Sequence, residues 1–207
     1  ENIDLIDRYV ADGSSYAVVD KLGKGSFAKL KEKVKDRLFA IANDIIKIAA
    51  ARELVNGIQI NTDKKILEDF QKSAGFDYTK DQKRSIREIF ADISSGRVMD
   101  RLLSGDVGFG KTEVAMNAML AVILDGFQAI FVCPTTLLAT QHYHSMQKRF
   151  SEFGINIAKL DGKTSAKEKT EIKKALEKGD IKLVIGTHSL LEIKTNNLAL
   201  VIIDEEH

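Results

Sequence analysis

One glycine-rich stretch constrains the fold of this chain more than any other feature. It has the form G-x-x-x-x-G-K-T, and its residues are Gly105, Asp106, Val107, Gly108, Phe109, Gly110, Lys111 and Thr112. The apolar segment 98–103 precedes it and a helical pattern follows it, which is the strand–loop–helix context of a phosphate-binding loop. Glycines let backbone N–H groups turn inward around phosphate oxygens, and the helix adds its positive N-terminal end. We therefore predict a P-loop that binds a nucleotide through these eight residues.

The last two residues of this loop indicate the cofactors. Lys111 would reach the β and γ phosphates of ATP, and the hydroxyl of Thr112 would ligate Mg²⁺. A glycine-rich turn without a ligand is the alternative interpretation, and the flanking strand and helix argue against it.

A second chemical signal follows the apolar run 200–203, and its residues are Asp204, Glu205, Glu206 and His207. An acid at the carboxyl end of a strand beside a P-loop can hold Mg²⁺, so we assign the metal to Thr112 and Asp204. Glu205 would orient and deprotonate the attacking water. Without other motifs, an apolar run followed by acids is usually just a strand that leaves the core. The P-loop upstream favours the catalytic interpretation, with Lys111, Asp204 and Glu205 as catalytic residues.

Helices and strands alternate around these motifs. Besides 98–103, we predict strands at 129–133, 155–160, 183–185 and 198–203, and helices at 111–124, 136–150 and 166–178. Thr79 and Gln82 have the spacing of a capping box that opens one further helix. Alternation of this kind predicts an α/β fold, a parallel sheet with helices on both faces.

A long helix is predicted ahead of the α/β region. Its apolar residues share one face, and Gly57 is the expected stop; they are Leu30, Val34, Leu38, Ile41, Ile45 and Ile48. Residues 21–53 hold nine Lys and Arg against four Asp and Glu. This charge either solvates the helix or faces a partner, and the pattern leaves both open. A short helix is expected at about residues 64–73.

Composition excludes several classes of protein. The 207 residues are 44% hydrophobic and 29% charged, which is ordinary for a globular protein. With a net charge of +1, any nucleic-acid site must be a local patch. The single Cys133 cannot form an internal disulfide, and the sequence has no signal peptide and no apolar run of membrane-spanning length. We expect a cytoplasmic protein without membrane contact.

The acidic stretch 204–207 resembles the DExH box of superfamily-two helicases and translocases. Phe76 with Gln82 resembles the family's adenine-reading motif, 134–139 resembles its motif Ia, and 186–188 resembles a later DNA-contacting motif. This resemblance implies a RecA-like lobe that uses ATP and Mg²⁺ and contacts DNA through Thr135, Thr136, Thr187 and His188. A helix start with hydroxyls can hold a DNA phosphate. Simple helix capping is the alternative for these residues.

Longer stretches are similar to the bacterial transcription-repair coupling factors, namely 99–116, 134–143, 165–168 and, near the start, 3–9 and 21–23. The resemblance implies three parts. Residues 1–25 would be the tail of an RNA-polymerase-interacting domain, 26–75 a connecting helix and linker, and 76–207 the first motor lobe. It also implies translocation on double-stranded DNA, with RNA polymerase and excision-repair proteins as partners.

Two alternatives stay open. The RecG-type fork-remodelling helicases share the stretches 105–108 and 186–188, and a non-catalytic, nucleotide-gated interaction module would use the basic helix as its partner surface. Since a second lobe with its arginine finger would come after His207, we expect an incomplete motor that binds nucleotide weakly and hydrolyses it poorly alone. Arg101, inside a predicted strand, needs an acidic partner that the sequence leaves open.

Overall fold

The structure, a computed structural model, describes residues 26–193, 195 and 197–205. The chain forms two compact units, residues 1–54 and 55–207. The expected polymerase-interacting tail, residues 1–25, lies outside the described residues, as do the last two residues of the acidic stretch. Helix α2 (Lys65–Lys72), which we assigned to the linker before residue 76, belongs to the second unit.

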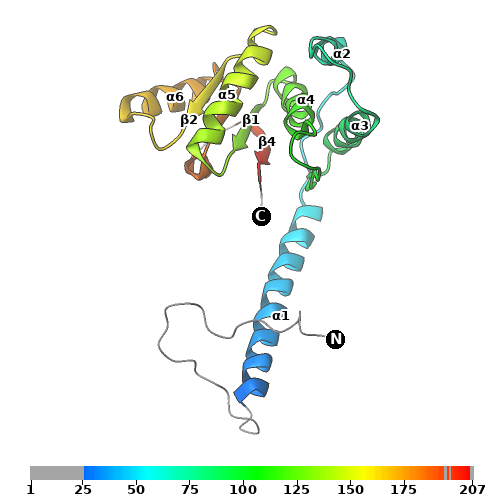
Figure 1. The fold of residues 1–207 in the computed structure, drawn as a ribbon, viewed down its shortest axis with the longest axis vertical. Coiled ribbons are helices and arrows are strands. Elements are labelled where there is room, and N and C mark those ends of the chain that lie inside the picture. Colours follow the sequence, from blue (N-terminus) through cyan, green and yellow to red (C-terminus); the bar gives the residue numbers. More distant parts are fainter. Residues whose placement is uncertain (1–25, 194, 196, 206–207) are drawn as a thin grey trace, which may run out of the picture. The chain divides into compact units, whose positions relative to one another are not determined.

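The described part of the first unit is the predicted long helix, α1 (Ser26–Glu53), seen as one continuous helix in Figure 1. Its sequence has neither glycine nor proline and is rich in Ala and Lys, both of which favour helix. Its side chains from Lys29 onward are exposed, including the apolar ones that share a face. Neither this helix nor any other in the described ranges is long and apolar enough to cross a membrane.

The second unit is built on a sheet of four parallel strands in the order β2-β3-β1-β4. The strands are β1 (Gln128–Val132), β2 (Ile157–Leu160), β3 (Leu183–Gly186) and β4 (Leu198–Ile203). Parallel neighbours need crossover connections, which helices α5 (Thr136–Ser151) and α6 (Ala166–Lys178) provide between β1, β2 and β3. The predicted α/β class is thereby confirmed.

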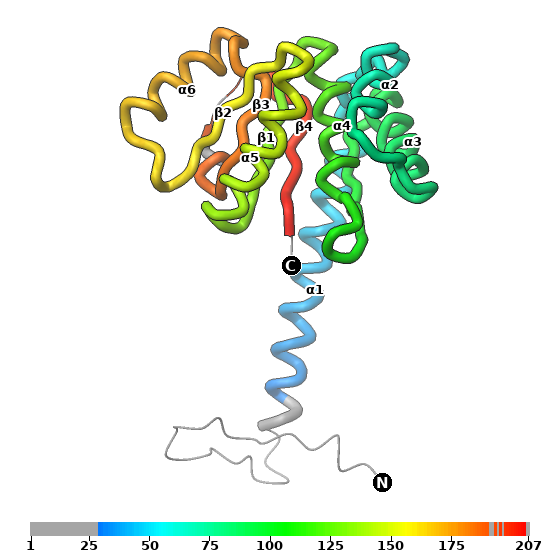
Figure 2. The backbone as a smooth tube through the Cα atoms, turned by 45° about the horizontal axis from the view of Figure 1, so that its top comes forward, coloured from blue at the N-terminus to red at the C-terminus, as the bar shows by residue number. Residues whose placement is uncertain are grey.

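Alternate residues of the strands face two separate cores. Phe131 of β1 and Ile185 of β3 pack with α4 (Lys111–Leu124) and α5 in the larger core, while Val132 and Val184 pack in the smaller core with Leu176 of α6. This period of two is what a sheet covered on both faces requires. Helices therefore cover both faces, as Figure 2 also shows.

Helix α4 is buried along nearly its whole length, from Glu113 to Ile123. It shares the larger core with residues of the sheet, of α2 and of α3 (Lys80–Ser94). A helix that is apolar all round fits such a position. At the start of α3, Thr79 and Gln82 form the predicted capping box. The P-loop helix is therefore held by packing from several sides.

The predicted strand at 98–103 is wrong, because the structure gives this segment no strand pairing. The side chain of Leu102 is 81% exposed. Arg101 explains the difference, since its Nε lies 2.6 Å from Oδ2 of Asp92 and its Nη1 lies 2.9 Å from Oε2 of Glu88. Both acids belong to α3, so these ion pairs tie the segment to that helix. They also identify the partners of Arg101 that the sequence left open.

Candidate active site

The glycine-rich loop ends directly at the N-terminus of α4, as predicted. Gly110 is the N-cap with a left-handed φ of 76°, and Gly108 has a φ of 84°. The left-handed backbone of Gly110 favours glycine, and a Cβ atom there would come 2.5 Å from Nε2 of Gln82 and displace that amide. The loop is open to solvent, with Val107 96% exposed. An exposed loop at the positive end of a helix is suited to phosphate.

The ammonium group of Lys111 folds back over this loop. Its Nζ lies 2.5 Å from the carbonyl oxygen of Gly105 and 3.0 Å from that of Asp106. The next residue, Thr112, is half-buried in the first turn of α4. The cation thus lies inside the loop, where phosphate oxygens can take the place of the carbonyls and form stronger, charge-assisted hydrogen bonds.

Gln82 joins the start of α3 to the P-loop. Its Oε1 accepts a hydrogen bond of 2.9 Å from the backbone N–H of Thr79, and its Nε2 donates one of 2.9 Å to the carbonyl of Phe109. An amide side chain has two donors and two acceptor lone pairs, so further hydrogen-bonding capacity remains. Phe76 is exposed, and its ring centroid is 5.6 Å from that of Tyr78. The two residues expected to contact adenine thus lie on either side of the start of α3, Phe76 before the helix and Gln82 in its first turn.

The predicted acidic residues follow β4 directly. The N–H of Asp204 donates a hydrogen bond of 2.8 Å to the carbonyl of Val132, which continues the pairing of β4 with β1. Glu205 has a φ of 53°, the one positive value at a non-glycine residue in the described ranges. Such conformations are uncommon for glutamate and cluster at functional sites. Figure 2 shows the end of β4 and the loop before α4 at the same end of the domain.

Cys133 carries a thiol close to these two acidic residues. Cys133 follows β1 and is completely buried. Burial, together with the negative charges of Asp204 and Glu205, raises its pKa to about 12. Cys133 is therefore a core residue with a neutral thiol.

His142 was not predicted as a site residue, yet it contacts Asp204. Its Nε2 lies 3.0 Å from Oδ2 of Asp204, and the two side chains are only 16% and 20% exposed. The imidazole also packs on Phe131, with ring centroids 5.1 Å apart. The sequence hides this contact because 62 positions separate the two residues. A periodic signal was present, since His142 lies seven residues after Thr135 and so shares its helix face.

The residues expected to contact DNA lie at the carboxyl ends of two neighbouring strands. Thr135 follows β1 and caps α5, where its hydroxyl accepts a hydrogen bond of 3.2 Å from the N–H of Leu138. Thr136 begins the helix. Thr187 follows β3 and precedes the exposed His188 in the short helix η2 (His188–Glu192). Because β1 and β3 are adjacent and parallel, the four residues belong to the same edge of the sheet. The capping role of Thr135 is confirmed.

A buried polar cluster lies directly behind the P-loop. The Tyr78 hydroxyl lies 2.5 Å from Oε1 of Glu113, and Nη2 of Arg149 lies 2.8 Å from the same oxygen. The Tyr78 hydroxyl also accepts a hydrogen bond of 3.2 Å from Asn117. Burial, with the hydrogen bond to Glu113, raises the pKa of Tyr78 well above its usual value. The cluster connects α5 to the first turn of α4, one residue after Thr112.

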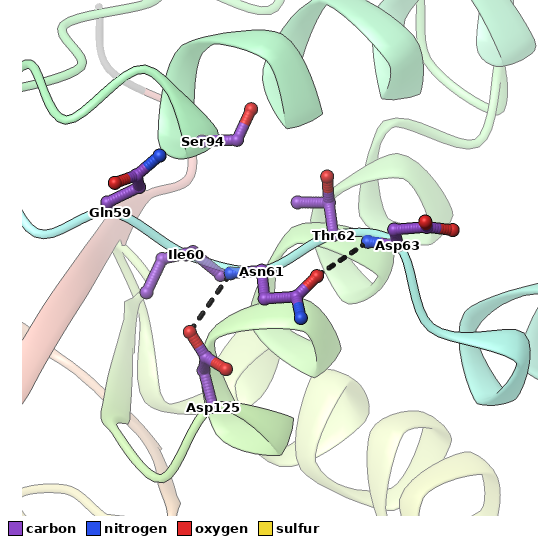
Figure 3. A pocket seen from close by; sticks show the side chains of 7 residues that line it. All are labelled: Gln59, Ile60, Asn61, Thr62, Asp63, Ser94 and Asp125. Carbon is purple, nitrogen blue, oxygen red and sulfur yellow. Dashed lines mark hydrogen bonds between the residues drawn. The ribbon is translucent and has the colours of Figure 1, made fainter.

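A separate hollow lies at the other end of α4. Figure 3 shows its lining, in which Asp125 accepts a hydrogen bond of 3.0 Å from the N–H of Asn61. Oδ1 of Asp125 also pairs with Lys64 at 2.8 Å, and these contacts lower the pKa of Asp125. The hollow thus lies where the segment before α2 is fixed to the domain, away from the P-loop at the start of the same helix.

Comparisons with known proteins agree with this geometry. Residues 79–207 match the DEAD/DEAH box helicase family. Over its whole length the chain is 52% identical to the transcription-repair-coupling factor of Helicobacter pylori (strain J99 / ATCC 700824) and 41% identical to that of Bacillus subtilis (strain 168). It spans only about a fifth of these relatives, 21% and 18% of their lengths.

Two solved structures are similar in fold. RecG bound to a three-way DNA junction matches 87% of this chain and 25% of that chain, with a TM-score of 0.75 and 43% identity. The DUF1998 helicase MrfA, bound to DNA and AMPPNP, matches 65% of this chain and 19% of that chain, with a TM-score of 0.51 and 18% identity. The second likeness is one of fold alone.

The resemblance to transcription-repair coupling factors is confirmed by the identity over the whole chain. DEAD/DEAH box helicase domains use ATP with Mg²⁺ in general. Since the family match covers well over half of the residues, this chain belongs to the DEAD/DEAH box helicases.

Proposed function

We propose that this chain is the first motor lobe of an ATP-driven double-stranded DNA translocase of the transcription-repair coupling type. The observation that carries the proposal is the meeting of two elements at one end of one domain. They are the P-loop at the start of α4 and the carboxylates of Asp204 and Glu205 at the end of β4. Phosphate and metal ligands placed together in this way are the parts that phosphoryl transfer requires.

The P-loop residues would hold the nucleotide. Residues 105–112 would surround the phosphates with backbone N–H groups, and Lys111 would exchange its carbonyl partners for β- and γ-phosphate oxygens. The donor set fits the group, because the loop combines two left-handed glycines, a cation and a helix N-terminus. Phe76 would stack on the adenine and Gln82 would hydrogen-bond to its edge. Gln82 already contacts the loop at Phe109, so it could also sense whether the loop is filled.

The hydroxyl of Thr112 and the carboxylate of Asp204 would hold Mg²⁺, which neutralises phosphate charge when bound. Glu205 would orient the attacking water and accept its proton. Its left-handed backbone turns the chain sharply after Asp204, so that the two neighbouring acids can serve different partners. Glu205→Gln in the full-length protein tests this role, because it should leave ATP binding intact while slowing hydrolysis.

Thr135, Thr136, Thr187 and His188 would contact the DNA backbone. Hydroxyl and backbone N–H donors at a helix start suit phosphate oxygens. Contacts to the DNA backbone do not depend on base sequence. This suits a translocase, which moves along duplexes of any sequence. Replacing the two threonines that begin α5 by alanine should weaken duplex binding without changing ATP affinity.

In the full-length protein, we propose that translocation displaces stalled RNA polymerase and recruits excision-repair proteins. The supporting observation is identity of 52% and 41% over the whole chain to two proteins named transcription-repair-coupling factor. The test is release of a stalled polymerase from DNA by the full-length protein and ATP. Release that depends on Lys111 would support the proposal, and intact ATPase without release would contradict it.

Fork remodelling of the RecG type is the second candidate, favoured by the 43% identity to RecG. Regression of a model replication fork by the full-length protein, with no release of polymerase, would favour this candidate. For the 207-residue chain by itself we propose slow ATP turnover, because superfamily-two motors complete their site with an arginine from a second lobe. An arginine finger contributes about 10³–10⁵-fold in rate. A turnover equal to that of the full-length protein would contradict this.

A further inference from the structure

We propose that His142 is a positioning residue that fixes the carboxylate of Asp204 for Mg²⁺ and links it to the DNA-facing helix α5. This inference rests on the proposed function. The ionised carboxylate of Asp204 can only accept hydrogen bonds, so Nε2 of His142 is the donor in the 3.0 Å contact. With Oδ2 held by His142, the carboxylate keeps one orientation, and Oδ1 would be the oxygen that it offers to Mg²⁺.

The contact is built into the domain. Both side chains are about four-fifths buried, and the imidazole is held against Phe131 of β1, the strand next to β4. The main chain of Asp204 is fixed independently by its hydrogen bond to Val132. Neither side chain therefore has much freedom to move away from the other. Exposed ion pairs, by contrast, are mobile and contribute little to stability.

Three polar residues with separate contacts lie along one face of α5 and its N-cap. Thr135, His142 and Arg149 are spaced by seven residues, and an ideal helix drifts only about 20° over that interval. Thr135 lies at the proposed DNA contact, His142 reaches Asp204, and Arg149 reaches Glu113. A small displacement of α5 at its DNA-facing end would therefore act on both the metal carboxylate and the P-loop helix.

A purely structural role for His142 makes a different prediction. The imidazole could serve only to fill space beside Phe131, in which case an apolar side chain of similar size would replace it without effect on Mg²⁺. Hydrogen-bond partners of metal-binding carboxylates typically contribute about 10- to 100-fold to metal affinity or activity. The two roles can therefore be separated by measuring metal dependence rather than stability alone.

The experiment uses the full-length protein and a fluorescent ADP analogue, titrated with and without Mg²⁺. We expect His142→Leu to raise the Mg²⁺ concentration for half-maximal tight binding by about 10-fold or more, with unchanged affinity for the nucleotide in the absence of metal. His142→Gln, whose amide nitrogen can take the place of Nε2, should restore most of the metal affinity. His144→Leu is the matched control, because this exposed histidine lies two residues away on α5.

Lys111→Ala separates failure of this inference from failure of the proposed function. If Lys111→Ala abolishes nucleotide binding while His142→Leu keeps wild-type Mg²⁺ dependence, the positioning role is refuted and the proposed function stands. If Lys111→Ala has no effect, the nucleotide site itself is wrong. Equal losses of metal affinity in His142→Leu and His142→Gln would also overturn the proposal, because the hydrogen-bond donor would then be irrelevant.

Discussion

Nη2 of Arg149 on α5 lies 2.8 Å from Oε1 of Glu113 on α4, and only 13% and 10% of the two side chains are exposed. Nη2 of Arg149 also donates to the carbonyl of Phe70 at 2.9 Å, and the guanidinium lies 4.3 Å from the centre of the Phe70 ring. One side chain thus joins α5 to α2 and to the P-loop helix.

Removal of this arginine should destabilise the domain strongly. Arg149→Leu would leave the carboxylate of Glu113 buried without its cation, which costs about 3–5 kcal/mol in the free energy of unfolding. Urea unfolding followed by circular dichroism measures this, since the chain has no tryptophan. Arg84→Leu is the control. Its ion pair with Asp81 is 2.9 Å long but 64% exposed at the arginine, so the cost should stay below about 1 kcal/mol. Equal losses in the two variants would contradict the structure.

Gly110 provides a test of the P-loop conformation. Gly110→Ala would impose a side chain on a φ of 76° and bring its Cβ to 2.5 Å from Nε2 of Gln82, so we expect a loss of nucleotide binding. Gly126→Ala has equally strained backbone, with a φ of 92°, but nothing within 4 Å of the new Cβ. It should cost about 1–2 kcal/mol of stability and keep nucleotide affinity. If fluorescence titration gave Gly110→Ala the nucleotide affinity of the wild type, nucleotide binding would not depend on this conformation of the loop.

Cys133 should be unreactive in the folded protein. Its side chain is fully buried and its pKa is raised to about 12, so the nucleophilic thiolate is scarce at any pH below that value. Below about pH 7 the thiol is neutral in the folded state, where its pKa is raised, and also in the unfolded state, where an ordinary cysteine has a pKa of about 8.5. It therefore contributes no pH dependence to stability there. A colorimetric thiol reagent should label one cysteine in urea and none in buffer. Rapid labelling in buffer would place Cys133 outside the core.

Much of the fold followed from local patterns. The predicted limits of α4, α6 and β4 agree with the structure, because each is an apolar or periodic segment bounded by a glycine, a cap or an acid. The capping box of Thr79 and Gln82 and the junction of the glycine-rich loop with α4 are local motifs as well, and both were predicted correctly. The strand expected before that loop does not form.

The errors and omissions come from contacts between distant residues. The segment 98–103 has the apolar residues of a strand, but Arg101 binds acids of α3 instead, and no propensity encodes that choice. His142 and Asp204 are 62 residues apart, and Arg149 and Glu113 are 36 apart. A histidine and an arginine on an amphipathic helix look like surface residues until the sheet and α4 are placed against them.

The central claim is that this lobe holds the catalytic residues with which the full-length protein hydrolyses ATP in response to DNA. The most direct measurement is the ATPase rate of the full-length protein with and without duplex DNA, for the wild type and for Glu205→Gln. We predict that the duplex stimulates the wild type and that Glu205→Gln loses about 10²–10⁴-fold in rate, the usual contribution of a general base, while it still binds ATP. A Glu205→Gln protein that hydrolyses ATP at the wild-type rate, or a wild type that ignores DNA, would contradict this claim.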